Sequence, residues 1–533
     1  MRSYEIFRFL FLFFPSMLVT DSIYASSDHK IISNKISVDS SSSGYPLIHY
    51  WSKVVGAGRA NEGLRASWQE QLELVHKNAN FRYVRMHGIF HDDMFVYRED
   101  EKGNPIYNFQ YVDDLYDRIL SKGMKPFVEL GFSPSQMASV QATIFWWKAN
   151  GSPPRDYHKW TALVEAFVRH CINRYGIDEV KNWYFEVWNE PNLSDPFFRG
   201  GNQKKYFELY RDTAISIKNI NENIKVGGPA TSNFYYKDGA WLPIWVSDFL
   251  KYAHTNNLPV DFVSVHPYPA SYPNKKDGET TYREKNATIE DINKIYDTVK
   301  NSDYPQAEIH LTEWSGTPKI HDYQHDSLAS ASYILRSVIG GYGKVDSLSY
   351  WVFTDIFEEF RNRDSAFHGG FGLVNFQGII KPSFHAYRFL NYLGDTVLFK
   401  NDNAIISKDK EIGDISILSW NYPDDVNTVV PNFNNIDKMK SFELSGKNMN
   451  FSIDINNLPP NEKYCVEILD YDHGYALPQW VKMGAPPSPT REQTKYLQNY
   501  AWGTKKMTIY TNNRGELKYS EQLHPWSILS IHK

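Results

Sequence analysis

Cysteine is nearly absent from this chain. Only Cys171 and Cys465 occur among 533 residues, and they lie far apart in the sequence. Two distant cysteines cannot form a disulfide framework, so the stability of the fold must come from its hydrophobic core. The length exceeds that of a single ordinary domain, and a large barrel with a smaller second module is expected.

An excess of charge of one sign is also missing. The formal net charge is −5, and no dense stripe of lysine and arginine interrupts the sequence. Proteins whose main task is to bind a phosphate backbone carry such stripes. The composition therefore excludes nucleic acid as the expected partner.

Long apolar runs are missing beyond the N-terminus. There, Arg2 and Arg8 flank the start of an apolar run over 9–19, and Ala25 stands where a signal peptidase would cut. We interpret residues 1–25 as a signal peptide, which predicts a secreted or periplasmic protein that is free of the membrane after cleavage. A retained anchor is the alternative, but the run contains Pro15 and is shorter than the ~20 apolar residues that span a bilayer.

Aromatic side chains are abundant. The chain holds 15 Trp, 36 Tyr and 32 Phe, which together make up 16% of its residues. This is more than a core alone requires, and it favours stacking surfaces for flat, half-apolar ligands such as sugars.

A regular alternation begins near Tyr50. Short runs rich in Val, Ile, Phe and Tyr alternate with segments whose apolar residues recur every three to four positions, which predicts strands joined by helical crossovers. Eight such strands predict an α/β fold, a (β/α)₈ TIM barrel over 49–390, with active-site groups at the C-terminal strand ends. The expected strands are 51–55, 83–87, 126–131, 183–189, 224–228, 262–266, 308–313 and 348–353, and the expected helices are 68–77, 112–122, 160–175, 204–219, 241–256, 289–299 and 327–340.

The pattern changes after the barrel. Residues 391–533 alternate with period two and carry turn signals, which predicts a β-sandwich accessory domain. Residues 26–48 read as a linker with one strand at 35–38, which we expect to join the sandwich.

Two carboxylates end strands on opposite sides of the predicted barrel rim, Glu190 and Glu313. Glycosidic cleavage needs such a pair, one acid to protonate the leaving oxygen and one carboxylate to face the anomeric carbon, at ~5–5.5 Å in a retaining enzyme. An ionised Glu313 would keep Glu190 protonated, and esterification of Glu313 would then free Glu190 to act as a base. A lone strand-end Glu is more often a solvated residue. Asn189 and Trp314, beside the two acids, make that alternative harder to hold.

The residues around these acids resemble those of clan A retaining glycosidases, and the wider chain resembles the β-xylosidases of glycoside hydrolase family 39. The resemblance covers nearly all of the mature chain. The stretches that carry it are 55–65, Arg85-Met-His-Gly88, His91-Asp-Asp-Met94, Trp188-Asn-Glu-Pro-Asn-Leu193, Asp261-Phe-Val-Ser-Val-His-Pro-Tyr268, Leu311-Thr-Glu-Trp-Ser315, 350–359, 367–373, Asp472-His-Gly474 and Pro489-Thr-Arg-Glu-Gln493.

The resemblance implies roles for individual residues. Glu190 would be the general acid/base, Glu313 the nucleophile, and Asn189 a donor to the sugar 2-hydroxyl. It implies no cofactor and no metal, an oligosaccharide substrate, and self-association into a homo-oligomer. The remaining sugar-binding groups would be His87, His266, Tyr268, Trp351, Glu358 and Glu359, with Phe197 as a wall of the pocket.

Several of these assignments have alternatives. Each histidine could be a hydrogen-bonded core residue, and one of Glu358 and Glu359 could hold an arginine or a loop. Pro267 departs from the small residue usual after His266 and could alter how Tyr268 is presented. His321 and His325 have i, i+4 spacing, but without a third ligand we interpret them as a solvated helix start.

Three functions remain open at this point. The first is a secreted retaining exo-β-xylosidase acting on xylo-oligosaccharides. The second is a family 39 enzyme for a uronic-acid glycoside or a bacterial exopolysaccharide, which the acidic rim formed with Asp355 disfavours. The third is a sugar-binding protein without catalysis, which the presence of both acids disfavours.

Overall fold

The structure is a computed structural model and describes residues 32–232, 241–270, 282–360 and 364–533, without the side chains of residues 241–244. The predicted signal peptide at 1–25 lies outside this part of the chain.

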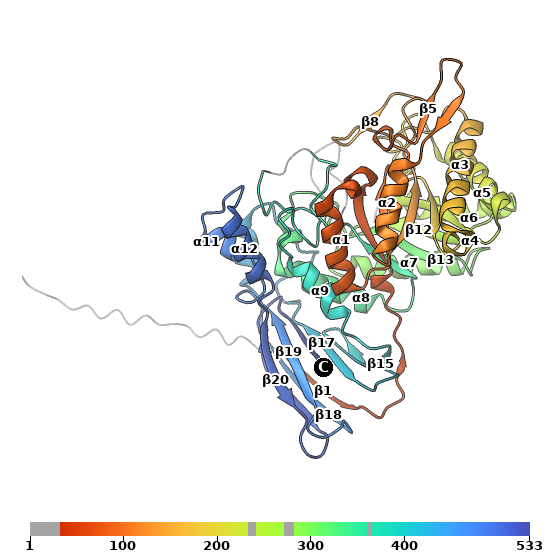
Figure 1. The fold of residues 1–533 in the computed structure, drawn as a ribbon. Helices are drawn as coiled ribbons and strands as arrows, with labels where there is room; N and C mark the ends of the chain where they lie inside the picture. The colour runs from red at the N-terminus through yellow and green to blue at the C-terminus, as the bar shows by residue number, and fades with distance from the viewer. Residues whose placement is uncertain (1–31, 233–240, 271–281, 361–363) are drawn as a thin grey trace, which may run out of the picture.

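Eight parallel strands close into a barrel (Figure 1). This confirms the predicted (β/α)₈ fold. Around the barrel they follow the order β10 (Tyr184–Val187), β11 (Lys225–Ser232), β12 (Phe262–His266), β13 (Glu308–Trp314), β14 (Ser347–Tyr350), β3 (Val54–Arg59), β4 (Tyr83–His87) and β7 (Lys125–Leu130).

The first barrel strand lies further along the chain than predicted. Residues 51–55 were expected as a strand, but Tyr50–Ser52 forms a 3₁₀ turn and β3 starts only at Val54. Trp51 is fully buried and its ring stacks on His49. The aromatic residues at this point are buried, as predicted, but their backbone is not extended. Hydrophobicity alone does not distinguish a buried strand from a buried turn.

The interior of the barrel is layered, because residues two apart on a strand point to the same side. Val54, Phe127, Tyr184 and Phe262 fill the lower layer as one apolar cluster. Two residues further along β7 and β10, at matching register, stand Glu129 and Glu186. On β7 and β10 the apolar side chains thus lie low in the barrel, and the acids lie closer to the C-terminal ends.

Helices surround the barrel (Figure 1), and all seven predicted segments are helical. The capping residues set some of their limits: Asp156 accepts hydrogen bonds from the backbone of His158 and Lys159 at the start of α3, and Gly176 follows its end. In the described part of the chain, no helix combines the length and apolarity that a membrane crossing requires. The helices are α1 (Ala66–Ala79), α2 (Gln110–Ser121), α3 (Tyr157–Tyr175), α5 (Gln203–Ile220), α6 (Trp241–Thr255), α7 (Ala287–Lys300), α8 (Leu328–Gly340) and α9 (Pro382–Leu390).

A second β-structure follows the barrel. One sheet has three strands, β1 (Ile32–Asp39), β18 (Met449–Asn456) and β21 (Leu517–Leu523), and the other has seven. β1 pairs in parallel with β18 over its whole length, so the strand expected at 35–38 does join this unit. Figure 1 shows it as a red strand among blue ones. Apolar side chains of both sheets form one core.

Three helices in this region were not predicted: α10 (Ile436–Glu443), α11 (Leu477–Lys482) and α12 (Arg491–Ala501). α12 begins with a capping box, in which Thr490 and Gln493 bond each other's backbone N–H groups. The sequence Thr-x-x-Gln carries this signal, but few apolar residues follow it, and a weak apolar stripe is easily missed.

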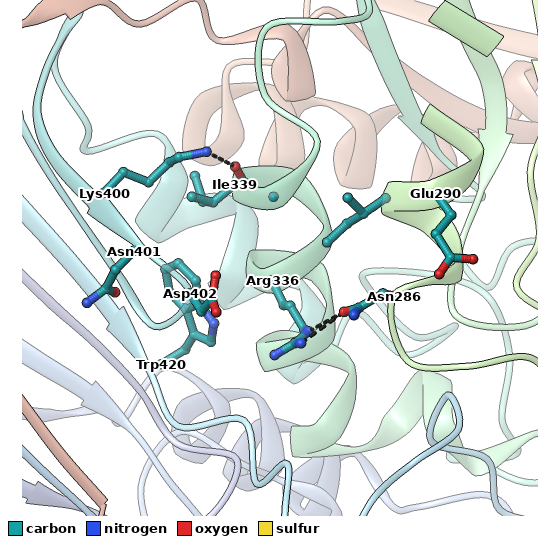
Figure 2. Close-up of a pocket in the computed structure, with 10 residues that line it drawn as sticks. Asn286, Glu290, Arg336, Ile339, Lys400, Asn401, Asp402 and Trp420 are labelled. Carbon is teal, nitrogen blue, oxygen red and sulfur yellow. Dashed lines mark hydrogen bonds between the residues drawn. The ribbon is translucent and has the colours of Figure 1, made fainter. Parts of the chain in front are cut away.

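A cavity of about 480 Å³ lies where α7 and α8 meet the seven-stranded sheet (Figure 2). Arg336 donates to the Asn286 side chain and Lys400 to the Ile339 carbonyl across it. Its charged residues, which also include Glu290 and Asp402, are of both signs. The paired acids singled out from the sequence lie elsewhere, at the mouth of the barrel.

Candidate active site

A small cavity of about 70 Å³ opens at the C-terminal ends of the barrel strands. Both predicted acids line it, together with most of the predicted sugar-binding residues. Its lining consists of His87, Phe145, Asn189, Glu190, Phe197, Tyr268, Glu313, Pro318, Trp351, Glu359, Phe360 and Phe371.

Glu190 stands on a strained turn directly after β10. Trp188 has φ 72° and Glu190 has φ 47°, values that residues other than glycine rarely adopt. The surroundings hold both residues in place: the Glu190 N–H donates to the Ala230 carbonyl at 2.9 Å, and the Trp188 indole donates to the Phe197 carbonyl at 2.9 Å. Strain that is held in this way is typical of functional sites.

Glu313 faces Glu190 from the end of β13. One of its oxygens accepts from Arg85 at 3.0 Å and the other from the Tyr268 hydroxyl at 2.9 Å. Pro267 therefore does not keep Tyr268 out of the site. An oxygen of Glu190, an oxygen of Glu313 and a ring nitrogen of His266 all lie within 4.8 Å of one another. The two carboxylates therefore lie close together, which favours the spacing of retaining glycosidases, ~5–5.5 Å, over the wider spacing of inverting ones.

The two acids differ in proton affinity. Burial raises the pKa of both, and the charge of Glu313 raises the pKa of Glu190 further, well above its usual value. Arg85, His87 and Tyr268 offset part of the effect of burial on Glu313, whose pKa nevertheless stays raised, at about 7. Glu190 is accordingly the acid that keeps its proton, and Glu313 the one that ionises first.

Arg85 organises the floor of the cavity and was not recognised from the sequence as a functional residue. Its guanidinium is fully buried and lies 2.6 Å from Glu186, 2.9 Å from Glu129 and 3.0 Å from Glu313. It also donates to the Asn189 side-chain oxygen at 2.8 Å, which leaves the amide N–H₂ of Asn189 for other acceptors. The sequence did offer a signal: Arg85, Glu129 and Glu186 are charged residues that stand among apolar neighbours on three separate strands.

His87 lies beside Trp351, with ring centroids 4.8 Å apart. Its Nδ1 lies 2.5 Å from Glu129 and its Nε2 lies 3.4 Å from Glu359. Burial lowers the pKa of His87, but the charges and hydrogen bonds of Glu129, Glu359 and Glu313 together outweigh burial, and the pKa rises to about 10. His87 is therefore a cation at neutral pH, held between two carboxylates.

His266 does not line the cavity. It is fully buried behind Glu190, with Nδ1 2.9 Å from a Glu190 oxygen and Nε2 3.1 Å from the Thr312 hydroxyl. Burial and the nearby charges of Arg85 and His87 lower the pKa of His266 well below its usual value, so its ring is neutral. His266 was predicted to bind the sugar, but in the structure it contacts Glu190 and does not reach the cavity.

Two rim acids do not take the places expected of them. Glu358 lies 2.6 Å from both Arg59 and Arg65, and of the adjacent pair only Glu359 is among the residues that line the cavity. Asp355 lies 2.7 Å from the buried Lys381 and accepts from the Gly372 N–H. Both acids hold loops, because each lies beside a cation from another part of the chain.

The prediction of a solvated helix start at His321 and His325 is wrong. His325 is fully buried, within 4.8 Å of the Phe371 ring, and its Nε2 lies 3.3 Å from the Lys319 carbonyl. His321 lies 3.0 Å from the His368 carbonyl. The segment packs against the cavity wall and is not a solvated helix start. The i, i+4 spacing could not show this, because burial here depends on a loop that is distant in the sequence.

By spacing alone, Glu190, Glu313 and His266 could also hold a metal ion. Their partners speak against it. The Arg85 cation lies 3.0 Å from Glu313, and Tyr268 donates to the other oxygen of that carboxylate. A metal ion would have to displace a donor and sit beside a fixed positive charge.

Comparison with known proteins gives one family. The family model described as "Glycosyl hydrolases family 39" matches residues 34–518. A protein named "Beta-xylosidase" from Geobacillus stearothermophilus is 37% identical over 455 residues, which is 84% of this chain and 85% of the relative. Another of that name from Caldicellulosiruptor saccharolyticus is 32% identical over 90% of this chain and 94% of its own length.

A solved structure agrees over almost the whole chain. The GH39 enzyme from Xanthomonas axonopodis pv. citri superposes with a TM-score of 0.85 at 30% identity, covering 96% of this chain and 99% of that one. The resemblance read from the sequence motifs is thereby confirmed. This chain belongs to family 39 of the glycosyl hydrolases.

Proposed function

We propose that the protein is a retaining exo-β-xylosidase that releases xylose from the ends of xylo-oligosaccharides. The observation that carries the proposal is the pair of buried carboxylates, Glu190 and Glu313, with oxygens within 4.8 Å at the floor of a cavity the size of one sugar.

The first step would form a covalent glycosyl-enzyme. Glu313 attacks the anomeric carbon as the glycosidic bond breaks, and Glu190 gives its proton to the leaving oxygen. Arg85 and Tyr268 favour the ionised form of Glu313, while burial and the Glu313 charge keep Glu190 protonated. Asn189, oriented by Arg85, would donate to the 2-hydroxyl, a contact that strengthens as charge develops on the ring.

The second step would reverse the role of Glu190. Once Glu313 is esterified, its negative charge is gone and Glu190 loses its proton more readily. The Glu190 carboxylate then takes a proton from a water that attacks the anomeric carbon, which breaks the ester and restores the starting configuration.

The size of the cavity supports exo-action. A cavity of about 70 Å³ is too small for several sugar units. Phe145, Phe197 and Phe371 are among the aromatic residues around it. An oligosaccharide would therefore enter with one terminal unit.

Xyloside is the substrate class that the two xylosidase relatives suggest. A uronic-acid glycoside would need a cation to meet its carboxylate. Among the described residues that line the cavity, His87 is the cationic one, and Glu129 and Glu359 already flank it. The cavity is therefore better suited to a neutral sugar.

The proposal is tested by assaying the purified protein on aryl β-xylosides, glucosides, arabinosides and glucuronides. We expect the xyloside to have the highest kcat/KM, and ¹H NMR to show β-xylose as the first product. Glu313→Gly should abolish turnover, and azide should restore activity to Glu190→Ala on a substrate with a good leaving group. Glu290→Gln, an exposed acid at the other cavity, is the matched control and should keep parental activity. A higher kcat/KM on a glucuronide, or α-xylose as first product, would overturn the proposal.

We also propose that the protein is exported with cleavage after Ala25. N-terminal sequencing of protein recovered outside the cytoplasm should begin at Ser26. Recovery of the intact N-terminus in a membrane fraction would show instead that residues 1–25 remain as an anchor.

A further inference from the structure

Behind Glu190 lies a chain of hydrogen bonds between fully buried side chains. His266 Nδ1 lies 2.9 Å from Glu190, His266 Nε2 lies 3.1 Å from the Thr312 hydroxyl, and that hydroxyl donates to Glu186 at 2.8 Å. Glu186 in turn accepts from Arg85 at 2.6 Å. The chain ends on an ion pair, which fixes the direction in which its hydrogens can point.

The direction follows from counting protons. Glu186, paired with Arg85, is a carboxylate and can only accept, so it takes the single hydroxyl proton of Thr312. The Thr312 oxygen then has only lone pairs to offer His266, and Nε2 must carry the hydrogen. In a neutral imidazole the other nitrogen is unprotonated. His266 therefore presents a lone pair to Glu190.

A lone pair facing Glu190 at 2.9 Å can accept a hydrogen bond only from the protonated carboxyl group. If Glu190 ionises, the same lone pair faces a negative oxygen and the bond is lost. We propose that Thr312 and Glu186 are positioning residues, which fix the tautomer of His266 so that its lone pair stabilises the protonated form of Glu190, the form that can give a proton to the leaving group. The inference rests on the function proposed above for Glu190.

The other charged groups around Glu190 come from two other strands of the barrel. Glu313 on β13 disfavours its ionisation, while Arg85 and His87 on β4 favour it. These two cations also keep His266 from taking up a proton itself, which supports the neutral ring that the argument requires. A substitution of Thr312 leaves these charged groups in place, so the effect of the His266 tautomer can be tested separately from the effects of the charges.

Replacing Thr312 by valine removes the hydroxyl and keeps the volume. His266 is then free to move its hydrogen to Nδ1 and donate to an ionised Glu190. We expect the alkaline limb of the kcat/KM profile to shift by about one unit to lower pH. Activity on an alkyl xyloside, whose leaving group needs the proton, should fall roughly tenfold more than activity on a dinitrophenyl xyloside, whose leaving group does not.

Two further variants make the comparison specific. Thr312→Ser keeps the hydroxyl, and the alkaline limb of its kcat/KM profile should lie at the parental pH. Thr231→Val makes the same substitution on β11, two strands away from β13, at a buried hydroxyl with no hydrogen-bond partner among the described residues, and should leave the alkaline limb in place. An unshifted limb in Thr312→Val, or an equal shift in Thr312→Ser, would overturn the proposal.

A direct measurement covers the case in which Thr312→Val does not fold. With ¹⁵N-histidine labelling and His266→Gln for assignment, the parent should show an unprotonated Nδ1 and a protonated Nε2 on His266. A protonated Nδ1 in the parent would contradict the inference. Both tests use whichever aryl glycoside the parent hydrolyses best, so a substrate other than xyloside changes the proposed function and leaves this test intact.

Discussion

Arg85 links four of the side chains on which catalysis is proposed to depend. Its guanidinium contacts Glu129, Glu186, Glu313 and Asn189 without exposure to solvent. A planar group with five fixed donors can satisfy such a ring of acceptors, whereas a lysine could not. Arg85 thereby sets both the charge near Glu313, the proposed nucleophile, and the orientation of the residue proposed to bind the sugar 2-hydroxyl.

Asn189 tests this orientation. Asn189→Ala removes a donor that is proposed to act mainly in the transition state, so kcat on an aryl xyloside should fall roughly 100-fold with a smaller change in KM. On the corresponding 2-deoxy xyloside the parent lacks the same contact, and the variant should lose little more. Equal losses on both substrates would mean that Asn189 supports the fold and does not bind the 2-hydroxyl.

The pH dependence of the reaction follows from the two acids. In the proposed mechanism Glu190 must be protonated for the first step, so we expect kcat/KM to fall as pH rises through its raised pKa. Glu313 must be ionised, so kcat/KM falls on the acid side as Glu313 takes up a proton. In Glu190→Ala on a dinitrophenyl xyloside, the alkaline limb should vanish and the acid limb should remain. Persistence of the alkaline limb would assign it to another group.

At the scale of elements, α10 and α8 meet at a buried acid. Glu443, the last residue of α10, accepts from the Leu328 N–H at the start of α8 and lies 3.2 Å from the Tyr475 hydroxyl. Burial raises the pKa of Glu443 to about 8. The folded protein therefore holds a proton that the unfolded chain releases above about pH 4.3.

The sign of the resulting effect is fixed by this difference. The unfolded chain binds fewer protons than the folded one between about pH 4.3 and 8, so this group makes stability fall as pH rises through that window. Glu443→Gln keeps an acceptor for Leu328 without the titration, and its Tm should fall less from pH 5 to pH 8 than the parental Tm. Scanning calorimetry at both pH values measures this, and parallel losses in the two proteins would contradict it.

Most elements could be predicted because their signals are local. The barrel strands and helices follow from hydrophobic period, and Glu190 and Glu313 were found because each ends such a strand. Contacts between distant strands carry no local signal. Arg85, Glu129 and Glu186 meet only when β4, β7 and β10 become neighbours, and Glu358 could not be assigned to Arg59 and Arg65 before the loops were placed.

At the scale of the whole molecule, the first described strand closes the last part of the fold. β1 pairs with β18, more than 400 residues away, and buries Ile36 and Val38 in the core between the sheets. Burial of such side chains stabilises by about 1.5–3 kcal/mol each. β1 therefore ties the first described residues of the chain to the sandwich.

Truncation tests this tie. Removal of residues 1–39 should lower the Tm of the protein by several degrees, at roughly 2–4 °C per kcal/mol lost, relative to removal of residues 1–31, which ends just before β1. Activity per folded molecule should be the same in both, because β1 lies outside the cavity lining. Equal Tm values would show that β1 adds nothing to the sandwich.

Self-association of the chain stays a prediction, which light scattering on the form that begins at residue 32 would measure.

The central claim is that Glu313 forms a covalent bond with the sugar. Incubation with a 2-deoxy-2-fluoro-β-xyloside carrying a good leaving group should trap the intermediate, because the fluorine slows its hydrolysis. Intact-mass spectrometry should show one added fluoroxylosyl group, and peptide mapping should place it on Glu313. An added group on any other residue, or turnover without an adduct and with α-xylose as first product, would contradict the account.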